Sequence, residues 1–408
     1  MIGSMRTSWM SWLETRALLA GLIALCSLVG FGCKQKVVEI RPLGQPQPAT
    51  PEGESADGRP RWKSIRTFAV GDAWATSPDG KYIATINDQR LRITTSLVGP
   101  VLHHVALPII AHDLIVTKSA VICFKRLDPA ATTVAVLDIK SGKWTRLETN
   151  ASIWQMTADA SGDGIWVSCG DHTVRHYPNV RAGATGMTQL VVPGYGGTLS
   201  ADPWGCIVSE VLPSGITAIS NDTTMRWHID EENPKRVSRV ITTQSGVLYL
   251  DSTVRSKPNS HTVTRISGST GAPLWETQHS GKFVNVAADQ KSGMLSVSVG
   301  NPGSRVPAKL FVYSGNGSVI MDGRGSGYFS PMLVGITEGG HRITVIDGQR
   351  GLTTLSDSGS TLARRVQFPA ISPELIDGQF SRLSVDDKFL FIQTATNKVH
   401  ILEALYGE

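Results

Sequence analysis

Residues 120–148 read AVICF KRLDPAAT TVAVLDI KSG KWTRLE. An apolar run at 120–124, an alternating run at 133–139 and a third run that opens at Lys143 and Trp144 are separated by a polar loop and by the turn 140–142. Alternation of apolar and polar residues, broken by turns that contain Gly and Ser, is typical of antiparallel strands. The stretch is therefore predicted to be a three-stranded β-meander.

Variants of this meander recur from about residue 70 to the C-terminus. They can be counted at the turn between the first and second strand, where Gly, Asp, Ser and Pro gather because the chain must reverse. Eight such turns occur, at 77–80, 118–119, 163–164, 203–205, 245–246, 292–293, 339–340 and 386–387. From Gly80 to Asp387, seven intervals span 307 residues, and their mean of about 44 lies in the range of roughly 40 to 50 residues for propeller blades. The sequence thus predicts an all-β fold, a β-propeller of eight four-stranded blades, with seven blades as the alternative.

Each turn is followed by a short run that is predicted to be the buried second strand of its blade. These runs are 81–86, 121–124, 165–169, 206–211, 247–250, 294–299, 342–346 and 389–393. Cys123, Cys169 and Cys206 fall within them. An odd number of cysteines in the domain argues against a disulfide framework, so all three are predicted to be buried thiols.

The composition limits the classes of partner. The 408 residues are 41% hydrophobic and 18% charged, with a formal net charge of +5. No run of Lys and Arg is long enough for a nucleic-acid-binding stripe, so no nucleic-acid partner is expected. Residues 61–408 are predicted to form one propeller domain, which is expected to be monomeric.

Residues 1–33 are predicted to be a targeting segment. Arg6 and Arg16 provide a positively charged start, and an apolar stretch follows at 17–31. A stretch of about 15 residues is short for a spanning helix, which needs about 20. An ordinary signal peptide and an uncleaved anchor are the alternatives to lipidation.

The end of this segment resembles the lipobox of bacterial lipoproteins, in which a small residue precedes a Cys that is diacylated on sulfur. Gly32 and Cys33 match that pattern, whereas Gly30 stands in place of the usual Leu and Phe31 in place of a small residue. The resemblance implies an exported protein that is lipid-anchored to the membrane through Cys33 at the cell envelope. Lys34 after the Cys implies the periplasmic face of the outer membrane in a Gram-negative host, and the cell surface otherwise.

Residues 34–60 are predicted to be a disordered, Pro-rich tether. Five prolines and three glycines interrupt polar residues, so neither a helix nor a strand can propagate. The next segment, 62–68, instead resembles the fourth strands of other repeats, whereas the last repeat has three strands before the chain stops. Because an open ring leaves a free strand edge, the N-terminal strand is predicted to complete the last blade and close the ring.

Two repeat signatures resemble known propeller families. Residues 136–144 and 265–275 are similar to the Asp-x-x-Thr-Gly-x-x-x-Trp signature of quinoprotein-like (PQQ-like) propellers, and residues 77–84 are similar to the blade turn of WD40-like repeats. The layout as a whole is similar to that of the propeller lipoprotein of the outer-membrane β-barrel assembly machinery. This resemblance implies the fold and the docking of tryptophans on turns.

Catalytic, cofactor and metal sites are not predicted. Quinoprotein dehydrogenases carry an adjacent Cys pair over the cofactor, and no two cysteines adjoin here. The segment 159–164 matches half of a Ca²⁺ loop, but Gly170 stands where the bidentate Glu is required, so a plain turn is expected. His103 with His104, and His172 with His176, lack the spacing of a metal site. No cofactor is expected, and the chain is predicted not to be an enzyme.

The candidate binding face is the rim that carries the second-to-third-strand loops. Three of these loops are predicted to be long, at 125–132, 251–261 and 300–309. The last two carry four basic residues that are predicted to form a partner-binding patch: Arg255, Lys257, Arg305 and Lys309. Such a patch suits an acidic envelope protein or an anionic envelope polymer; the alternative is that these are merely solvated loops.

The predicted function is a non-catalytic protein-interaction or envelope scaffold. The alternative is a hydrolase, lactonase or ligand-binding protein whose site lies in the central channel. A cluster of His, Asp, Glu and Arg that converges at one mouth of the channel would favour the alternative.

We predict that Cys33→Ala releases the protein from membranes. The anchoring energy comes from buried acyl CH₂ groups, at about 0.8 kcal/mol each. Phase partitioning in detergent should therefore move the variant from the detergent phase to the aqueous phase. Unchanged partitioning would support the uncleaved anchor instead.

Overall fold

The computed structural model describes residues 61–69, 71–95, 99–211, 215–230, 235–243, 245–254, 257–281, 283–289, 292–300, 309–324, 332–337, 342–347, 351–356, 376–383, 389–394 and 398–405. The chain divides into two units, Met1–Thr50 and Pro51–Glu408, and all described residues belong to the second. The first unit and the predicted lipidation site Cys33 lie outside the described residues.

The first half of the described chain forms four antiparallel sheets, each of four strands in sequential order. The first contains β2 (Ala73–Thr76), β3 (Tyr82–Asn87), β4 (Arg90–Thr95) and β5 (Val101–Ala106), and the second contains β6 (Asp113–Val116), β7 (Ala120–Phe124), β8 (Thr133–Asp138) and β9 (Trp144–Glu148). The third contains β10 (Ile153–Ala158), β11 (Ile165–Cys169), β12 (Thr173–Tyr177) and β13 (Thr188–Val191), and the fourth contains β14 (Tyr195–Asp202), β15 (Gly205–Val211), β16 (Gly215–Ser220) and β17 (Met225–Asp230).

The second half continues the pattern. The fifth sheet contains β18 (Lys235–Thr242), β19 (Leu248–Val254), β20 (Lys257–Ile266) and β21 (Pro273–Ser280), and the sixth contains β22 (Phe283–Ala288), β23 (Leu295–Gly300), β24 (Lys309–Tyr313) and β25 (Val319–Arg324). The seventh contains β26 (Met332–Thr337), β27 (Arg342–Asp347) and β28 (Gly351–Ser356), and the eighth contains β29 (Ile376–Leu383), β30 (Phe389–Thr394), β31 (Lys398–Leu405) and β1 (Arg61–Ala69).

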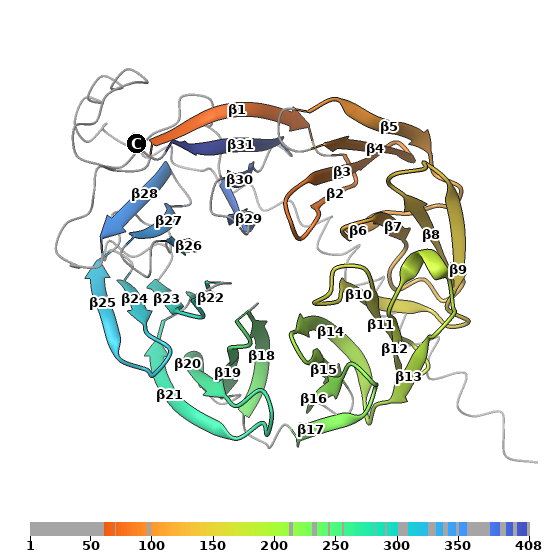
Figure 1. Ribbon diagram of the computed structural model, residues 1–408. Coiled ribbons are helices and arrows are strands. Elements are labelled where there is room, and N and C mark those ends of the chain that lie inside the picture. The colour runs from red at the N-terminus through yellow and green to blue at the C-terminus, as the bar shows by residue number, and fades with distance from the viewer. Residues whose placement is uncertain are drawn as a thin grey trace, which may run out of the picture. The chain divides into compact units, whose positions relative to one another are not determined.

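The sheets follow one another around a common centre, and the first strands of successive sheets lie side by side (Figure 1). The all-β propeller prediction is confirmed. The seventh sheet has three strands among the described residues, so the count of eight four-stranded blades, with seven as the alternative, stays a prediction.

The core lies between neighbouring sheets and is built mainly from their second and third strands. Ile122 of β7 and Val167 of β11 belong to one apolar cluster between the second and third sheets, and Ile207 and Leu250 belong to another between the fourth and fifth. Both faces of β7 and β11 are buried, because each sheet has a neighbour on either side. All eight predicted second-strand runs match strands of the structure, and the buried thiols Cys123, Cys169 and Cys206 are confirmed.

The turn after the first strand is capped in the same way in several sheets. In six sheets the side chain of a short polar residue accepts a hydrogen bond from a backbone N–H of the turn, at 2.7 to 3.1 Å. All six are buried: Ser77, Thr117, Asp159, Asp202, Thr243 and Asp289. A buried N–H without a partner costs about 1–3 kcal/mol, so these caps explain why the turns recur with the same chemistry.

Ring side chains of the fourth strands tie neighbouring sheets together. The indole N–H of Trp227 donates to Gly268 O at 2.8 Å, and that of Trp275 donates to Gly315 O at 3.0 Å, each in the third-to-fourth-strand turn of the next sheet. Gly271 has a φ of +71°, and a Cβ there would lie 2.9 Å from the Trp227 ring. The expected docking of tryptophans on turns is confirmed at these two junctions.

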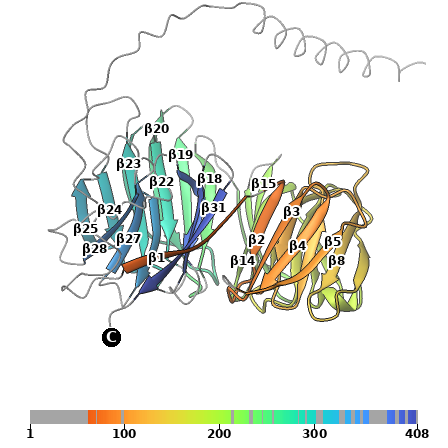
Figure 2. The ribbon, with the colours of Figure 1, turned by 90° about the horizontal axis from the view of Figure 1, so that it is seen from above.

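The first strand of the domain completes the last sheet. β1 pairs antiparallel with β31 from Arg61↔Leu405 to Ala69↔Lys398, and the two strands lie side by side (Figure 2). The eighth sheet contacts the first through Ile83 and Phe391, and Trp74 Nε1 donates to Gln393 Oε1 at 2.6 Å. The predicted closure by the N-terminal strand is confirmed.

Helical structure in the described part of the chain is limited to the 3-10 helix η1 (Val180–Ala182). None of the helices described there is long and apolar enough to cross a membrane.

Deletion of residues 61–69 should lower the free energy of unfolding by several kcal/mol. It removes the whole ladder to β31 and exposes the edge of that strand. Deletion of 34–60 is the matched control and should leave the midpoint of urea unfolding nearly unchanged. Equal loss of stability in the two truncations would contradict the role of β1 in closure.

Candidate functional site

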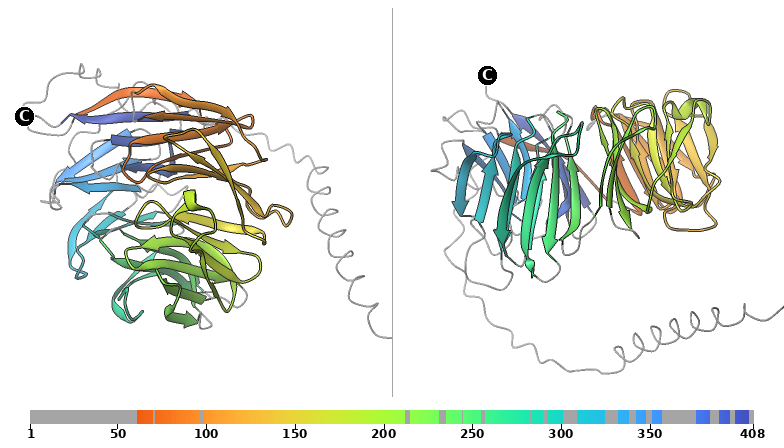
Figure 3. Two further views of the ribbon diagram at one scale, coloured as in Figure 1. Left: turned by 45° about the vertical axis from the view of Figure 1, so that its right-hand side comes forward. Right: turned by 90° about the horizontal axis from the view of Figure 1, so that it is seen from below.

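The strand registers define two rims of the propeller (Figure 3). One rim, called the turn rim, carries the first-to-second-strand and third-to-fourth-strand turns. The other, called the loop rim, carries the second-to-third-strand loops and the connections between sheets. Loops on a rigid scaffold are where binding residues usually lie, so the two rims are treated separately.

The predicted basic patch belongs to the loop rim. Lys309 is exposed and opens β24, where it pairs with Val299, and Lys257 opens β20. Arg255 and Arg305 lie outside the described residues. The patch of four basic residues therefore stays a prediction.

The expected loop at 251–261 is wrong. β19 and β20 pair from Leu248↔Ile266 to Val254↔Lys257, so most of this stretch is a β-hairpin. Asp251 is buried, and its Oδ1 lies 3.2 Å from His261 Nδ1 on the neighbouring strand. Polar side chains that satisfy one another across strands can be buried in a sheet, and their polarity alone made the segment resemble a loop.

The loop 125–132 between β7 and β8 holds Leu127 in an unusual conformation. Leu127 has a φ of +58°, a region that L-residues other than Gly, Asn and Asp rarely adopt. Its backbone N–H donates to Ile153 O of the next sheet at 2.8 Å. The Leu127 side chain is 67% exposed, so the strained backbone presents an apolar group to solvent.

Charged neighbours fix this loop on both sides of Leu127. Lys125 Nζ lies 2.7 Å from Asp128 Oδ2, and Arg126 Nη2 lies 2.7 Å from Asp113 Oδ1 at the start of β6. Asp128 Oδ1 also accepts the Ala130 N–H at 2.9 Å. The loop is thus held in place by contacts that do not involve the Leu127 side chain.

Two other apolar side chains at the loop rim are as exposed as Leu127. Ile110, in the connection to β6, is 67% exposed, and Val191, at the end of β13, is 66% exposed. These three, called the apolar rim residues, are the most exposed large apolar side chains in the described part of the chain. Sequence reasoning missed them, because an isolated Leu or Ile beside a strand is read as part of the core.

Groups of His with a carboxylate occur in three different sheets. His176 Nε2 lies 3.2 Å from Asp159 Oδ2 in the third sheet, and His261 faces Asp251 in the fifth. In the third sheet His176 also stacks on Trp166, with ring centroids 4.0 Å apart. His261 and Asp251 link strands within the fifth sheet, whereas His176 also reaches the fourth sheet, where its Nδ1 lies 3.2 Å from Asn221 O. The two groups are therefore structural links in different parts of the ring.

The group in the fourth sheet has the order of a catalytic triad. Thr217 Oγ1 lies 2.8 Å from His228 Nδ1, and His228 Nε2 lies 2.9 Å from Asp230 Oδ1. However, Thr217 is fully buried and its hydroxyl donates to Glu210, whose side chain is also fully buried. A nucleophile must reach its substrate, so this buried hydroxyl serves as a hydrogen-bond link between strands.

Among the described residues, no group of three or more His, Cys, Asp and Glu side chains is placed to hold a metal ion. Asp159 Oδ1 accepts from the N–H groups of Gly162 and Gly164 and from Ser161 Oγ, so the stretch 159–164 is the plain turn that was predicted.

His279 is a buried histidine at the junction of the fifth and sixth sheets. Its Nε2 lies 3.2 Å from the Tyr313 hydroxyl and 3.4 Å from Thr277 Oγ1, and its ring packs beside Phe311. Burial, with a smaller contribution from the nearby His261, lowers the pKa of His279 to about 4. The ring is therefore neutral in the folded protein near pH 7.

Comparison with known proteins identifies the fold. No protein-family model matches the chain, and no curated protein matches it. The Dos1 propeller is 11% identical over 85% of this chain and 96% of its own, with a TM-score of 0.58. BamB from Moraxella catarrhalis is 14% identical over 84% of this chain and 100% of its own, with a TM-score of 0.51. A chain in the mitotic checkpoint complex is 13% identical over 91% of this chain and 100% of its own, with a TM-score of 0.51.

These likenesses confirm the resemblance to PQQ-like and WD40-like propellers at the level of the fold. Identities this low carry no information on what the chain binds.

We predict that stability falls as the pH is lowered from 7 to 5, in part because of His279. The unfolded chain binds this proton near pH 6.5 and the folded chain near pH 4, so the stabilisation is complete above 6.5 and is lost toward 4. Linkage gives a loss of about 2 kcal/mol in the free energy of unfolding between pH 7 and pH 5.

His279→Gln removes this titration, so the urea midpoint of the variant should fall less over the same pH range. The difference between the two urea midpoints at each pH reports His279 alone. Asp251 is present in both proteins, and because burial raises its pKa, its contribution to stability changes with pH in the opposite direction. Parallel slopes in the two proteins would contradict the assignment.

Proposed function

We propose that this protein is a non-catalytic interaction scaffold that binds a protein partner through its loop rim. In this proposal the chain is exported and lipid-anchored through Cys33, and the segment 34–60 holds the propeller away from the membrane. The anchor would keep the propeller at the envelope, so envelope proteins are its candidate partners. The three His–carboxylate groups support a non-catalytic role, because each links strands or neighbouring sheets of the fold.

The observation that carries the proposal is Leu127. A β-carbon at positive φ costs roughly 1–2 kcal/mol, and a Leu that is 67% exposed returns little burial energy to the fold. Glycine at this position would satisfy the same turn without either cost. A side chain that the fold does not need, held rigidly outward, has the properties of a binding anchor.

The charges around Leu127 indicate the kind of contact it makes. Lys125, Arg126 and their acidic partners neutralise one another within the loop. The apolar rim residues therefore suit an apolar patch on the partner, whereas the predicted basic residues Arg255, Lys257, Arg305 and Lys309 suit an acidic region beside it. Apolar anchors with a polar rim are the usual anatomy of a protein interface.

Leu127→Gly tests the proposal, because binding and stability should change in opposite directions. The variant should keep or raise the melting temperature, since glycine relieves the strain at φ +58°. Its yield of cross-linked partners from envelope membranes should fall about tenfold or more, since a buried Leu contributes roughly 2 kcal/mol or more to an interface.

Val319→Ala, at an exposed position on the turn rim, is the matched control and should capture the same partners as the natural protein. A second variant with all four basic residues changed to Glu tests the charged part of the surface. Retention of every partner at the same yield by Leu127→Gly and by the Glu variant would exclude the loop rim as the binding face.

A further inference from the structure

The turn rim carries an exposed tryptophan in the turn between β14 and β15. Trp204 is 45% exposed, and it is the only aromatic side chain among the exposed large apolar residues of the described chain. A Cβ at Gly246 would lie 2.7 Å from the Trp204 ring, and a Cβ at Gly268 would lie 2.3 Å from it. The ring therefore packs directly on the backbone of two turns of the next sheet and leaves its remaining surface to solvent.

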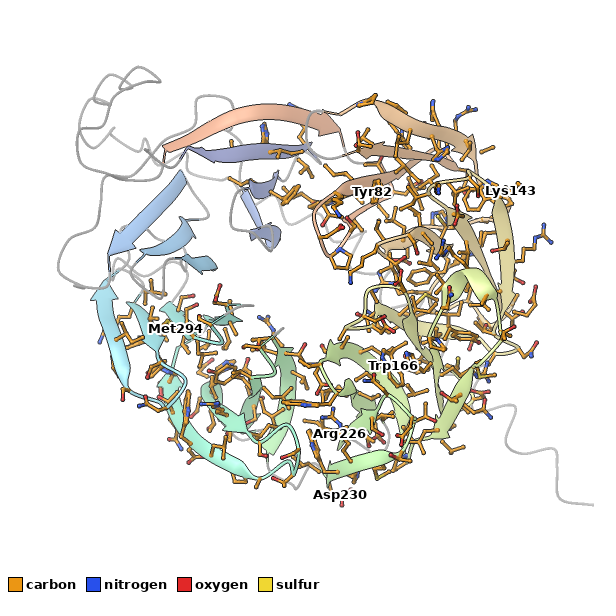
Figure 4. The ribbon with its side chains drawn as sticks, viewed as in Figure 1. Tyr82, Lys143, Trp166, Arg226, Asp230 and Met294 are labelled. Atoms are coloured by element: carbon orange, nitrogen blue, oxygen red, sulfur yellow. The ribbon has the colours of Figure 1, made fainter. Side chains whose placement is uncertain are left out.

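A buried ion pair fixes the orientation of Trp204. The guanidinium carbon of Arg226, which Figure 4 labels on the fourth sheet, lies 5.7 Å from the centroid of the Trp204 ring. Arg226 Nη2 lies 2.6 Å from Asp202 Oδ2, and its Nη1 donates to Gly268 O at 2.8 Å. Because Asp202 also caps the turn that contains Trp204, ring and turn are held as one rigid unit.

Trp204 differs from the tryptophans that join sheets. Trp227 and Trp275 donate their indole N–H groups to carbonyls of the next sheet, and Trp227 is buried. The indole N–H of Trp204 makes no hydrogen bond within the described part of the chain. A ligand can therefore use both the exposed surface of the ring and this N–H donor.

Polar groups lie on the turn next to the one that carries Trp204. The Asn221 N–H donates to Trp204 O at 3.0 Å, which places the turn 220–224 next to Trp204. Asn221, Asp222 and Thr224 are exposed in this turn. Hydrogen bonds from Ser220 and Thr224 lower the pKa of Asp222 to about 2, so the turn next to that of Trp204 carries an ionised carboxylate at neutral pH.

We propose that Trp204 is a stacking platform for a pyranose ring of an uncharged oligosaccharide. Such a ring presents C–H groups on one face, which suit an indole, and hydroxyl groups at its edge, which suit an N–H donor, an amide and a carboxylate. The Asp222 carboxylate disfavours phosphate and other anions. A proline-rich peptide is the less favoured ligand, because grooves for such peptides are lined by several aromatic side chains and Trp204 stands alone here. The proposal concerns the turn rim and is independent of the function proposed for the loop rim.

Titration of the full-length protein in detergent with three uncharged tetrasaccharides tests the proposal: chitotetraose, cellotetraose and maltotetraose. Isothermal titration calorimetry and the change in tryptophan fluorescence are the readouts. At least one sugar should saturate the protein with a Kd in the millimolar range, which is about the affinity of a single small stacking site.

The variants identify the site. Trp204→Ala should weaken binding at least tenfold, and Trp204→Phe, which keeps a ring but loses the N–H, should weaken it by less. Leu274→Ala, at a 56% exposed position on the same rim, is the matched control and should bind as the natural protein does. A thermal melt of each variant confirms that it is folded.

Three results would overturn the proposal. They are the absence of saturation by all three tetrasaccharides, equal binding by Trp204→Ala, and binding of decaproline at Trp204 when no sugar binds. The last result would assign the platform to a peptide ligand.

Discussion

The structure depends on face-to-face packing between neighbouring sheets. Strands such as β7 and β11 are buried on both faces, so each sheet needs an apolar neighbour on either side. A linear row of such sheets would leave two apolar faces in water, and joining the two ends covers both. β1 makes this possible, because it brings the start of the domain onto the last sheet, whose Phe391 then packs with Ile83 of the first. One strand pairing between residues far apart in sequence therefore determines whether the first and last sheets are fully covered.

The turns supply a second constraint that acts at each junction. A buried Ser, Thr or Asp caps the first turn of six sheets, and at two junctions a tryptophan N–H bonds to a turn carbonyl of the next sheet. These groups make hydrogen bonds with backbone N–H and C=O groups of the turns, which have no partner in the strand ladders. They also explain why glycines recur in the third-to-fourth-strand turns, where Gly271 and Gly317 have positive φ and lie against tryptophan rings. Apolar packing thus holds the faces of neighbouring sheets together, and polar contacts at the turns join their edges.

Much of this fold could be predicted from local patterns. The run 165–169 is exactly the length of β11, and the three cysteines could be placed on buried strands because apolar runs between turns have a simple signal. The caps were missed, although a Ser, Thr or Asp recurs about every 42 residues just before the turn, at positions 77, 117, 159, 202, 243 and 289. The β19–β20 hairpin was read as a loop because Asp251 and His261 are polar, and only their mutual contact shows that both belong in a strand. The candidate site was the least predictable part, since exposure and backbone strain depend on tertiary neighbours.

Leu127 and Trp204 combine exposure with rigid support. Leu127 is 67% exposed at positive φ, and Trp204 is 45% exposed and, unlike Trp227 and Trp275, donates its indole N–H to no group in the described part of the chain. Each is nonetheless held rigidly, Leu127 by the ion pairs of its loop and Trp204 by Arg226 and two glycines. Residues that bind something outside the chain are expected to be exposed and yet rigidly held, since preorganisation lowers the entropic cost of association. The two residues lie on opposite rims, so a partner on one rim leaves the other open to a second ligand.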